Sequence, residues 1–394
     1  MHEPEDQDTV GDRLHEVGRR LSDRGQFVGA RLWFERALAE KARGDGQGRV
    51  DHESLGNTLH EIAWCLMEQG QYAEALPWCH RAVAETERGD VHGRVDHSAL
   101  GISLHQVGAC LCEQGQYAEA RVWFERAAAD KDRGDKHGRV DHESVGGSLH
   151  QVGFCLSALG QRAEALGWYR RAVAEAEQGD RRGRVDHESV GAGLYCIGYC
   201  LSALGQYAEA RPCFERAVTE KEQGDVEGRV DHETLGRALH EVGHCLSQQE
   251  QHAEALPWYE RAVTEKGRGD WQGRVDQDSL GCSLHAVGHC LLQQGKGAEV
   301  LSWYERAIAA KEQGDVYGRV DHESLGHSLH GVGAFLAGQG QPKEALLWYE
   351  RAAAEKARGD VHGQVDQESL KLSVAAVSQM RESLDRGGAE ADSR

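Results

Sequence analysis

Gly-Arg-Val-Asp at residues 48–51 returns every 45 residues along this 394-residue chain. The later copies begin at residues 93, 138, 183, 228, 273 and 318, and Gly-Gln-Val-Asp follows at 363–366. No insertion or deletion changes the spacing. A fixed period of this size is typical of stacked supersecondary units, none of which can bury its apolar face alone. The repeat therefore predicts a solenoid, and it favours a binding scaffold over an enzyme.

Residues 96–140 show what one repeat predicts. Asp96 is a candidate N-cap for a first helix, helix A, over 97–114, and Gly115 ends that helix as a C′ glycine. A second helix, helix B, follows and ends at Gly134. The apolar residues of helix A recur at helical spacing, namely Leu100, Leu104, Val107, Cys110 and Leu111. Each repeat is thus predicted to be a helical hairpin.

The whole chain is predicted to be an all-α solenoid of eight such hairpins. A ninth helix A over 367–384 lacks a helix B and is predicted to be the C-terminal cap. The polar segments 1–8 and 385–394 are predicted to be disordered. The repeats are expected at 9–51, 52–96, 97–141, 142–186, 187–231, 232–276, 277–321 and 322–366.

The repeat resembles the tetratricopeptide repeat in residue identity and spacing. The matching residues are Val107, Gly108, Leu111, Gly115, Tyr117, Ala120, Phe124 and Ala127. The longer period, the Asp-His before helix A and the proline in Ala75-Leu-Pro-Trp-Cys-His-Arg-Ala82 resemble the kinesin-light-chain subtype. The resemblance implies a right-handed superhelix with helix A on its concave face. No kinesin-type coiled coil is present, so cargo binding by a motor is not implied.

Two helix-A positions, seven residues apart, vary between otherwise similar repeats. Seven residues is two helical turns, so both positions share one face with a nearly constant histidine column between them. Large aromatic residues at variable exposed positions are suited to anchoring a partner. We therefore predict a peptide- or protein-binding groove, although drift at an exposed surface is the alternative. The predicted contact residues are His60, Trp64, His105, His150, Phe154, Tyr195, Tyr199, His240, His244, His285, His289 and His330.

The histidine column has three interpretations: bracing between repeats, ligand contact, or metal binding. With a pKa near 6.5, ligand-contacting histidines would make binding pH-sensitive. The metal interpretation is the weakest, since no Cys-x-x-Cys pattern supports it. Its candidates are His240, His244, His285 and His289, two i, i+4 pairs on adjacent helices. We predict no metal, no cofactor and no catalytic residue.

Composition narrows the choice of partner. The formal charge of −20 and the pI near 5.5 disfavour nucleic acid and favour a basic or neutral peptide. No signal-like or membrane-spanning apolar run is present, and the repeated cysteines suit a reducing compartment. We expect a cytoplasmic protein, and the Ala-, Gly- and Arg-rich usage indicates a bacterial source.

Two other classes of function remain open. Near-identical repeats can assemble into a ring or a filament without any other partner. The array can also be the sensor arm of a larger machine, regulating an enzyme on another chain. Dependence of assembly on concentration would support the first class.

Overall fold

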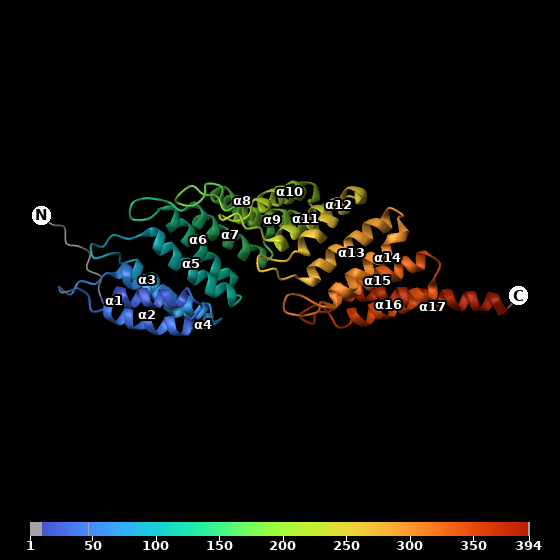
Figure 1. Cartoon of the computed structure of the whole chain (residues 1–394), viewed down its shortest axis with the longest axis horizontal. Coiled ribbons are helices and arrows are strands. Elements are labelled where there is room, and N and C mark those ends of the chain that lie inside the picture. The colour runs from blue at the N-terminus through green and yellow to red at the C-terminus, as the bar shows by residue number, and fades with distance from the viewer. Residues whose placement is uncertain (1–9, 46, 393–394) are drawn as a thin grey trace. The chain divides into compact units, whose positions relative to one another are not determined.

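The computed structural model describes residues 10–45 and 47–392, without the side chains of Ala298 and of 387–392. Within those ranges every regular element is an α-helix, as predicted (Figure 1). The helices are α1 (Val10–Ser22), α2 (Phe27–Lys41), α3 (His52–Met67), α4 (Tyr72–Thr86), α5 (His97–Glu113), α6 (Tyr117–Asp132), α7 (His142–Ala158), α8 (Arg162–Ala176), α9 (His187–Ala203), α10 (Tyr207–Gln223), α11 (His232–Gln248), α12 (His252–Lys266), α13 (Gln277–Gln293), α14 (Gly297–Lys311), α15 (His322–Gly338), α16 (Pro342–Lys356) and α17 (Gln367–Asp392).

The helices belong to two compact units, divided at Leu204–Gly205, inside the fifth repeat. Unit 1 contains the hairpins α1/α2, α3/α4, α5/α6 and α7/α8 and ends with α9. Unit 2 begins with α10 and contains the hairpins α11/α12, α13/α14 and α15/α16, followed by α17. Odd-numbered helices are the predicted helices A, and even-numbered helices are the helices B.

Capping residues define where each helix A begins and ends. The Asp96 side chain accepts a hydrogen bond from the backbone N–H of Ala99, and Asp141 caps α7 in the same way. Gly115 has a φ of 74°, a left-handed conformation that costs glycine little. These contacts confirm the predicted N-cap and C′ glycine.

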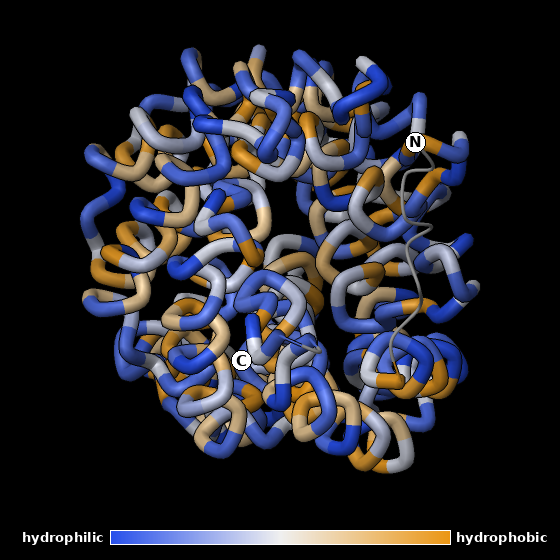
Figure 2. Tube along the Cα trace, turned by 90° about the vertical axis from the view of Figure 1, so that its left-hand side faces the viewer, coloured by the Kyte–Doolittle hydropathy of each residue, from blue (hydrophilic) through white to orange (hydrophobic). Residues whose placement is uncertain are grey.

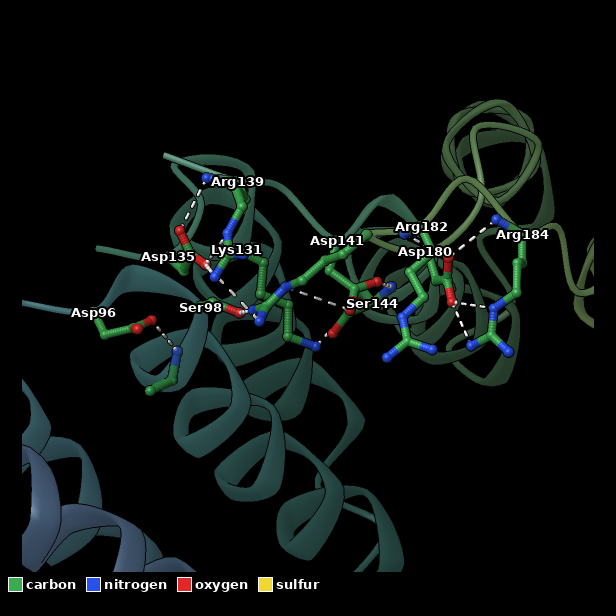
Figure 3. Close-up of polar contacts among 12 residues, drawn as sticks. Asp96, Ser98, Lys131, Asp135, Arg139, Asp141, Ser144, Asp180, Arg182 and Arg184 are labelled. Atoms are coloured by element: carbon green, nitrogen blue, oxygen red, sulfur yellow. Dashed lines mark hydrogen bonds and ion pairs between the residues drawn. The ribbon is translucent and has the colours of Figure 1, made fainter. Parts of the chain in front are cut away.

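The loop between repeats is held by one aspartate and one arginine. Oδ1 of Asp135 accepts from the backbone N–H groups of His137 and Arg139, and Oδ2 accepts from Nε of Arg139. The same arrangement recurs at Asp180 and Arg184 (Figure 3). Asp135 is the last residue of an Arg-Gly-Asp tripeptide at 133–135. The tripeptide therefore has a structural role in the loop.

Apolar residues of helices A and B form the buried core of each unit. Figure 2 shows hydrophobic and hydrophilic residues alternating along the helical segments. In the third repeat the buried side includes Leu104, Val107, Cys110 and Phe124. All 11 cysteines are free thiols. Among the described residues, no helix is both long enough and apolar enough to cross a bilayer.

Two features of the array differ from a regular repeat. Glu250 replaces the turn glycine and has a φ of 60°, so the turn keeps its shape with a strained residue. The final helix, α17, packs against α16 and ends at Asp392, not at the predicted residue 384. Residues 385–392 contain no proline, although Gly387 and Gly388 have low helix propensity. The predicted disordered segment 1–8 lies outside the described residues.

Candidate protein-binding surface

The predicted aromatic anchors lie on the exposed side of the helices A. The exposed fraction is 42% for Trp64 on α3, 43% for Phe154 on α7 and 50% for Tyr199 on α9. Within each unit, we call the surface formed by this position on its odd-numbered helices the helix-A face of that unit. His244 on α11 and His289 on α13 occupy the equivalent positions in unit 2 and are half-buried.

Neighbouring repeats support several of these side chains. The ring of Phe154 packs edge-to-face against Tyr117 of the preceding helix B, with centroids 6.1 Å apart. His244 packs in the same way against Tyr207, and His289 against His252. The side chain at the variable position of one repeat thus packs against the first residue of helix B in the repeat before it. A side chain held in this way loses less conformational entropy when a partner binds.

The histidine column lies behind these anchors and braces the repeats. Nδ1 of His105 and Oγ of Ser148 on the next helix A are 3.0 Å apart, joined by a hydrogen bond. The His105 ring also packs edge-to-face on Phe124 of its own helix B, with centroids 4.9 Å apart. The pairs His15–Thr58, His240–Ser283 and His330–Ser373 repeat the same hydrogen bond. Of the three interpretations, the structure favours bracing.

Burial makes these histidines poor pH sensors. Desolvation lowers the pKa of His60 and of His330 to about 4 and that of His105 to about 3. His240 and His285 shift in the same direction for the same reason. The expectation of a pKa near 6.5 was therefore wrong for this column, because its rings are enclosed between helices. The histidine column therefore gives no reason to expect a pH-sensitive affinity for a partner near neutral pH.

Four members of the column depart from the pattern. Tyr195 replaces histidine on α9. For His150 the position that supplies a serine hydroxyl to His105 is occupied by Gly193, and its Nε2 lies 3.5 Å from Sγ of Cys196. Nδ1 of His60 and Nδ1 of His285 are buried without a hydrogen-bond partner. The column is thus a brace with local interruptions.

The four histidines suggested as a metal site do not form one. Nδ1 of His240 is hydrogen-bonded to Oγ of Ser283. The His285 ring packs against Tyr304, with centroids 5.2 Å apart. His244 and His289 each lie near a glutamine on their own helix. Across the described part of the chain, no three His, Cys, Asp or Glu side chains are grouped closely enough to hold an ion. Two i, i+4 histidine pairs on adjacent helices are therefore not enough to form a metal site here.

Two hollows lie next to each other on the helix-A face of unit 1. One, of about 240 Å³, is lined by His105, Phe124, His150 and Phe154. The other, of about 330 Å³, is lined by Glu143, Ala176, Ser189 and Gly193. Both include His150 and Gln151 of α7. An exposed aromatic ring beside two small hollows is an arrangement that can hold side chains of an extended peptide.

Sequence reasoning missed a column of buried lysines beside the histidines. Nζ of Lys131, at the end of α6, donates to the carbonyl oxygen of Ser144 at 3.1 Å and to Oγ of Ser148 at 2.9 Å. The only sequence signal was a lysine recurring at the end of helix B. The other buried members are Lys221, Lys266, Lys311 and Lys356.

Two exposed aromatic side chains lie off the helix-A face, on loops of unit 2. The exposed fraction is 65% for Trp271 and 78% for Tyr317. The repeat comparison did not select them, because it examined the helices A only. The guanidinium of Arg319 lies 5.1 Å from the Tyr317 ring centroid, so part of that ring is already covered by a cation.

Comparisons with known proteins agree with this architecture. Residues 54–133 and 189–264 match the tetratricopeptide repeat family model. No curated protein sequence matches the chain. The apo form of the quorum sensor NprR from B. thuringiensis is similar with a TM-score of 0.57 and 12% identity, over 97% of this chain and 96% of that one.

Two further solved structures are similar over a smaller part of this chain. The nearly identical repeats of a putative kinesin light chain from Podosopora anserina have a TM-score of 0.41 and 24% identity, over 54% of this chain and 94% of that one. YrrB, a repeat protein with an unusual peptide-binding site, has a TM-score of 0.38 and 18% identity, over 59% of this chain and 91% of that one. The family match and the helical hairpins confirm the predicted resemblance to the tetratricopeptide repeat.

Proposed function

We propose that this protein binds a peptide segment or a partner protein along its helix-A face. Tetratricopeptide repeats typically mediate such interactions, and the fold is generally a non-catalytic scaffold. The observation that carries the proposal is the exposure of Trp64, Phe154 and Tyr199 at one repeat position on three helices. Isolated exposed apolar residues are ordinary, but large aromatics recurring at one variable position on a rigid array are suited to binding.

The variable and the constant columns of the helix-A face have different proposed roles. The variable aromatics are the proposed anchors, with Tyr195, His244 and His289 as neighbouring contacts. The buried histidines His60, His105, His150, His240, His285 and His330 contribute by fixing the spacing of those helices. This assignment differs from the original expectation, in which the histidines made the generic polar contacts. The acidic charge favours a partner that is basic or neutral.

The test is partner capture by a triple variant. We expect Trp64→Ala, Phe154→Ala and Tyr199→Ala together to weaken capture from a lysate of the source cells by about 100-fold or more, since anchors of this kind each contribute about 2 kcal/mol. The matched control replaces three exposed apolar residues on helices B, Leu32, Val122 and Leu347, with alanine.

The comparison between the two triple variants decides the outcome. Both should remain folded, because the replaced side chains are exposed. Loss of a specific partner in the helix-A variant alone supports the proposal. Equal capture by both variants contradicts it and moves the interaction to the loops or to self-assembly.

A further inference from the structure

The buried lysine column is interrupted at residue 176, and a cavity lies at this position. Lysine occupies the end of helix B in six of the eight repeats, while Thr86 and Ala176 occupy it in the second and fourth. The cavity of about 330 Å³ on the helix-A face of unit 1 lies at Ala176. Its lining includes Glu143, Gly146, Ser189 and Gly193, which come from α7 and α9.

The third repeat shows what normally fills this space. The Lys131 side chain crosses Gly101 of its own helix A so closely that a Cβ there would lie 2.4 Å from its Cγ. Its ammonium group then reaches the first turn of the next helix A and donates to the carbonyl oxygen of Ser144 (Figure 3). Adding 45 to each number maps Lys131 to Ala176, Gly101 to Gly146 and Ser144 to Ser189. All three of these counterparts line the cavity.

Three other repeats place an ammonium group in the same way. Lys266 donates to the carbonyl oxygen of Ser279 at 2.9 Å. Lys311 donates to that of Ser324 at 2.8 Å, and Lys356 to that of Ser369 at 3.3 Å. The carbonyl oxygen at this helix position is therefore a recurring acceptor for a primary ammonium group. At Ser189 the chain supplies the acceptor and, with alanine at 176, no lysine to meet it.

Glu143 adds a carboxylate that has lost its usual cation. Its counterpart Glu233 lies near Lys266, where burial lowers the lysine pKa and the carboxylate partly offsets that effect. Glu323 acts on Lys356 in the same way. Around Glu143 the neighbouring charges include three carboxylates, those of Asp141, Asp180 and Asp186, together with Arg184. Burial and these carboxylates raise the pKa of Glu143, so a further positive charge nearby would stabilise its ionised form.

We propose that this cavity binds a primary ammonium group of a partner, namely the side chain of a lysine. The ammonium would donate to the carbonyl oxygen of Ser189 and to the carboxylate of Glu143, replacing the lysine that other repeats supply internally. Gly147, His150, Gln151 and Phe154 are spaced to share one side of α7, so the cavity lies beside a proposed anchor. This inference deepens the proposed function and rests on it only for the source of the lysine.

The cavity can be tested without any partner protein. The probe is n-butylammonium chloride, titrated into the full-length ¹⁵N-labelled protein at constant ionic strength, with amide shifts of residues 176 and 193 as the readout. We expect saturable, millimolar binding. The uncharged 1-butanol, which has the same number of heavy atoms, should bind at least about tenfold more weakly, because a hydrogen bond from a charged group is lost. Equal binding of 1-butanol, or no saturable shift with butylammonium, overturns the proposal.

Variants of this chain make the assignment specific. Ala176→Lys should fill the cavity and abolish butylammonium binding, whereas the matched Thr86→Lys should leave binding unchanged. Thr86 suits this control because its hydroxyl donates to the carbonyl oxygen of Ala82 and its repeat's acid, Glu53, already pairs with Lys136.

Glu143→Gln keeps the proposal testable if a lysine variant does not fold. It should weaken butylammonium binding by about tenfold or more. Unchanged affinity in Glu143→Gln, or in a folded Ala176→Lys variant, contradicts the proposal. The capture experiment with the aromatic triple variant does not involve this cavity. A failure here and a failure of the proposed function are therefore distinguishable.

Discussion

At the scale of single residues, a histidine has a different role depending on how deeply its ring is buried. Histidines of the constant column such as His105 and His240 are enclosed between helices and remain neutral, and their Nδ1 is hydrogen-bonded to a hydroxyl of the next repeat. At the variable position, His244 and His289 lie nearer the surface. Constancy within the column thus reflects packing, and variation four residues further along the helix reflects freedom from packing.

Neutral burial of the histidine column predicts acid sensitivity of the fold. The folded-state pKa of His105 is about 3, whereas the unfolded chain binds the proton near pH 6.5. Its stabilising contribution is therefore complete above pH 6.5 and is lost as the pH falls toward 3. When the pH is lowered from 7.5 to 4.5, the unfolding free energy should fall in both proteins. The fall should be about 2 kcal/mol smaller in His105→Gln than in the wild type.

Urea denaturation at the two pH values measures this difference. His137, an exposed loop histidine, provides the control, since His137→Gln should retain the wild-type pH dependence. Equal acid destabilisation of His105→Gln and the wild type would mean that His105 is not enclosed as the structure has it.

At the scale of elements, the hairpins follow from local signals that the sequence displays openly. Asp96 and Gly115 mark the ends of α5, and the apolar spacing between them defines its buried side. The partners of the buried lysines could not be predicted, because Lys131 and Ser144 meet only after two helices have packed together. The neutral state of the histidines was missed for the same reason. Spacing placed them on one face without revealing how deeply the neighbouring helices enclose them.

Glu250 gives a test of the turn chemistry. Its φ of 60° costs a non-glycine residue about 1 kcal/mol relative to glycine. We expect Glu250→Gly to raise the unfolding free energy by about 0.5–1 kcal/mol, measured by urea denaturation. Gln249→Gly is the matched control and should destabilise, since Gln249 has a φ of −97° and gains nothing from glycine. A loss of stability in Glu250→Gly would contradict this account of the turn.

At the scale of the whole molecule, repetition makes the exceptions informative. Eight repeats of one length allow each position to be compared with its counterparts, and two exceptions coincide in the fourth repeat. Phe154 is an exposed aromatic at a variable position, and the missing lysine at 176 leaves a hollow beside it. The exposure of the variable position could be predicted from this comparison alone. The cavity could not, because the significance of Ala176 depends on where Lys131 points.

The central claim is that a partner lies on the helix-A face, and site-specific photocrosslinking tests it most directly. A photoreactive phenylalanine analogue at position 154 on α7 should crosslink the partner in lysate of the source cells. The same analogue at position 122, an exposed apolar site on α6, should not. A partner crosslinked from 154 and absent from 122 is the predicted result. Equal crosslinking from both positions, or crosslinking from 122 alone, would contradict the claim.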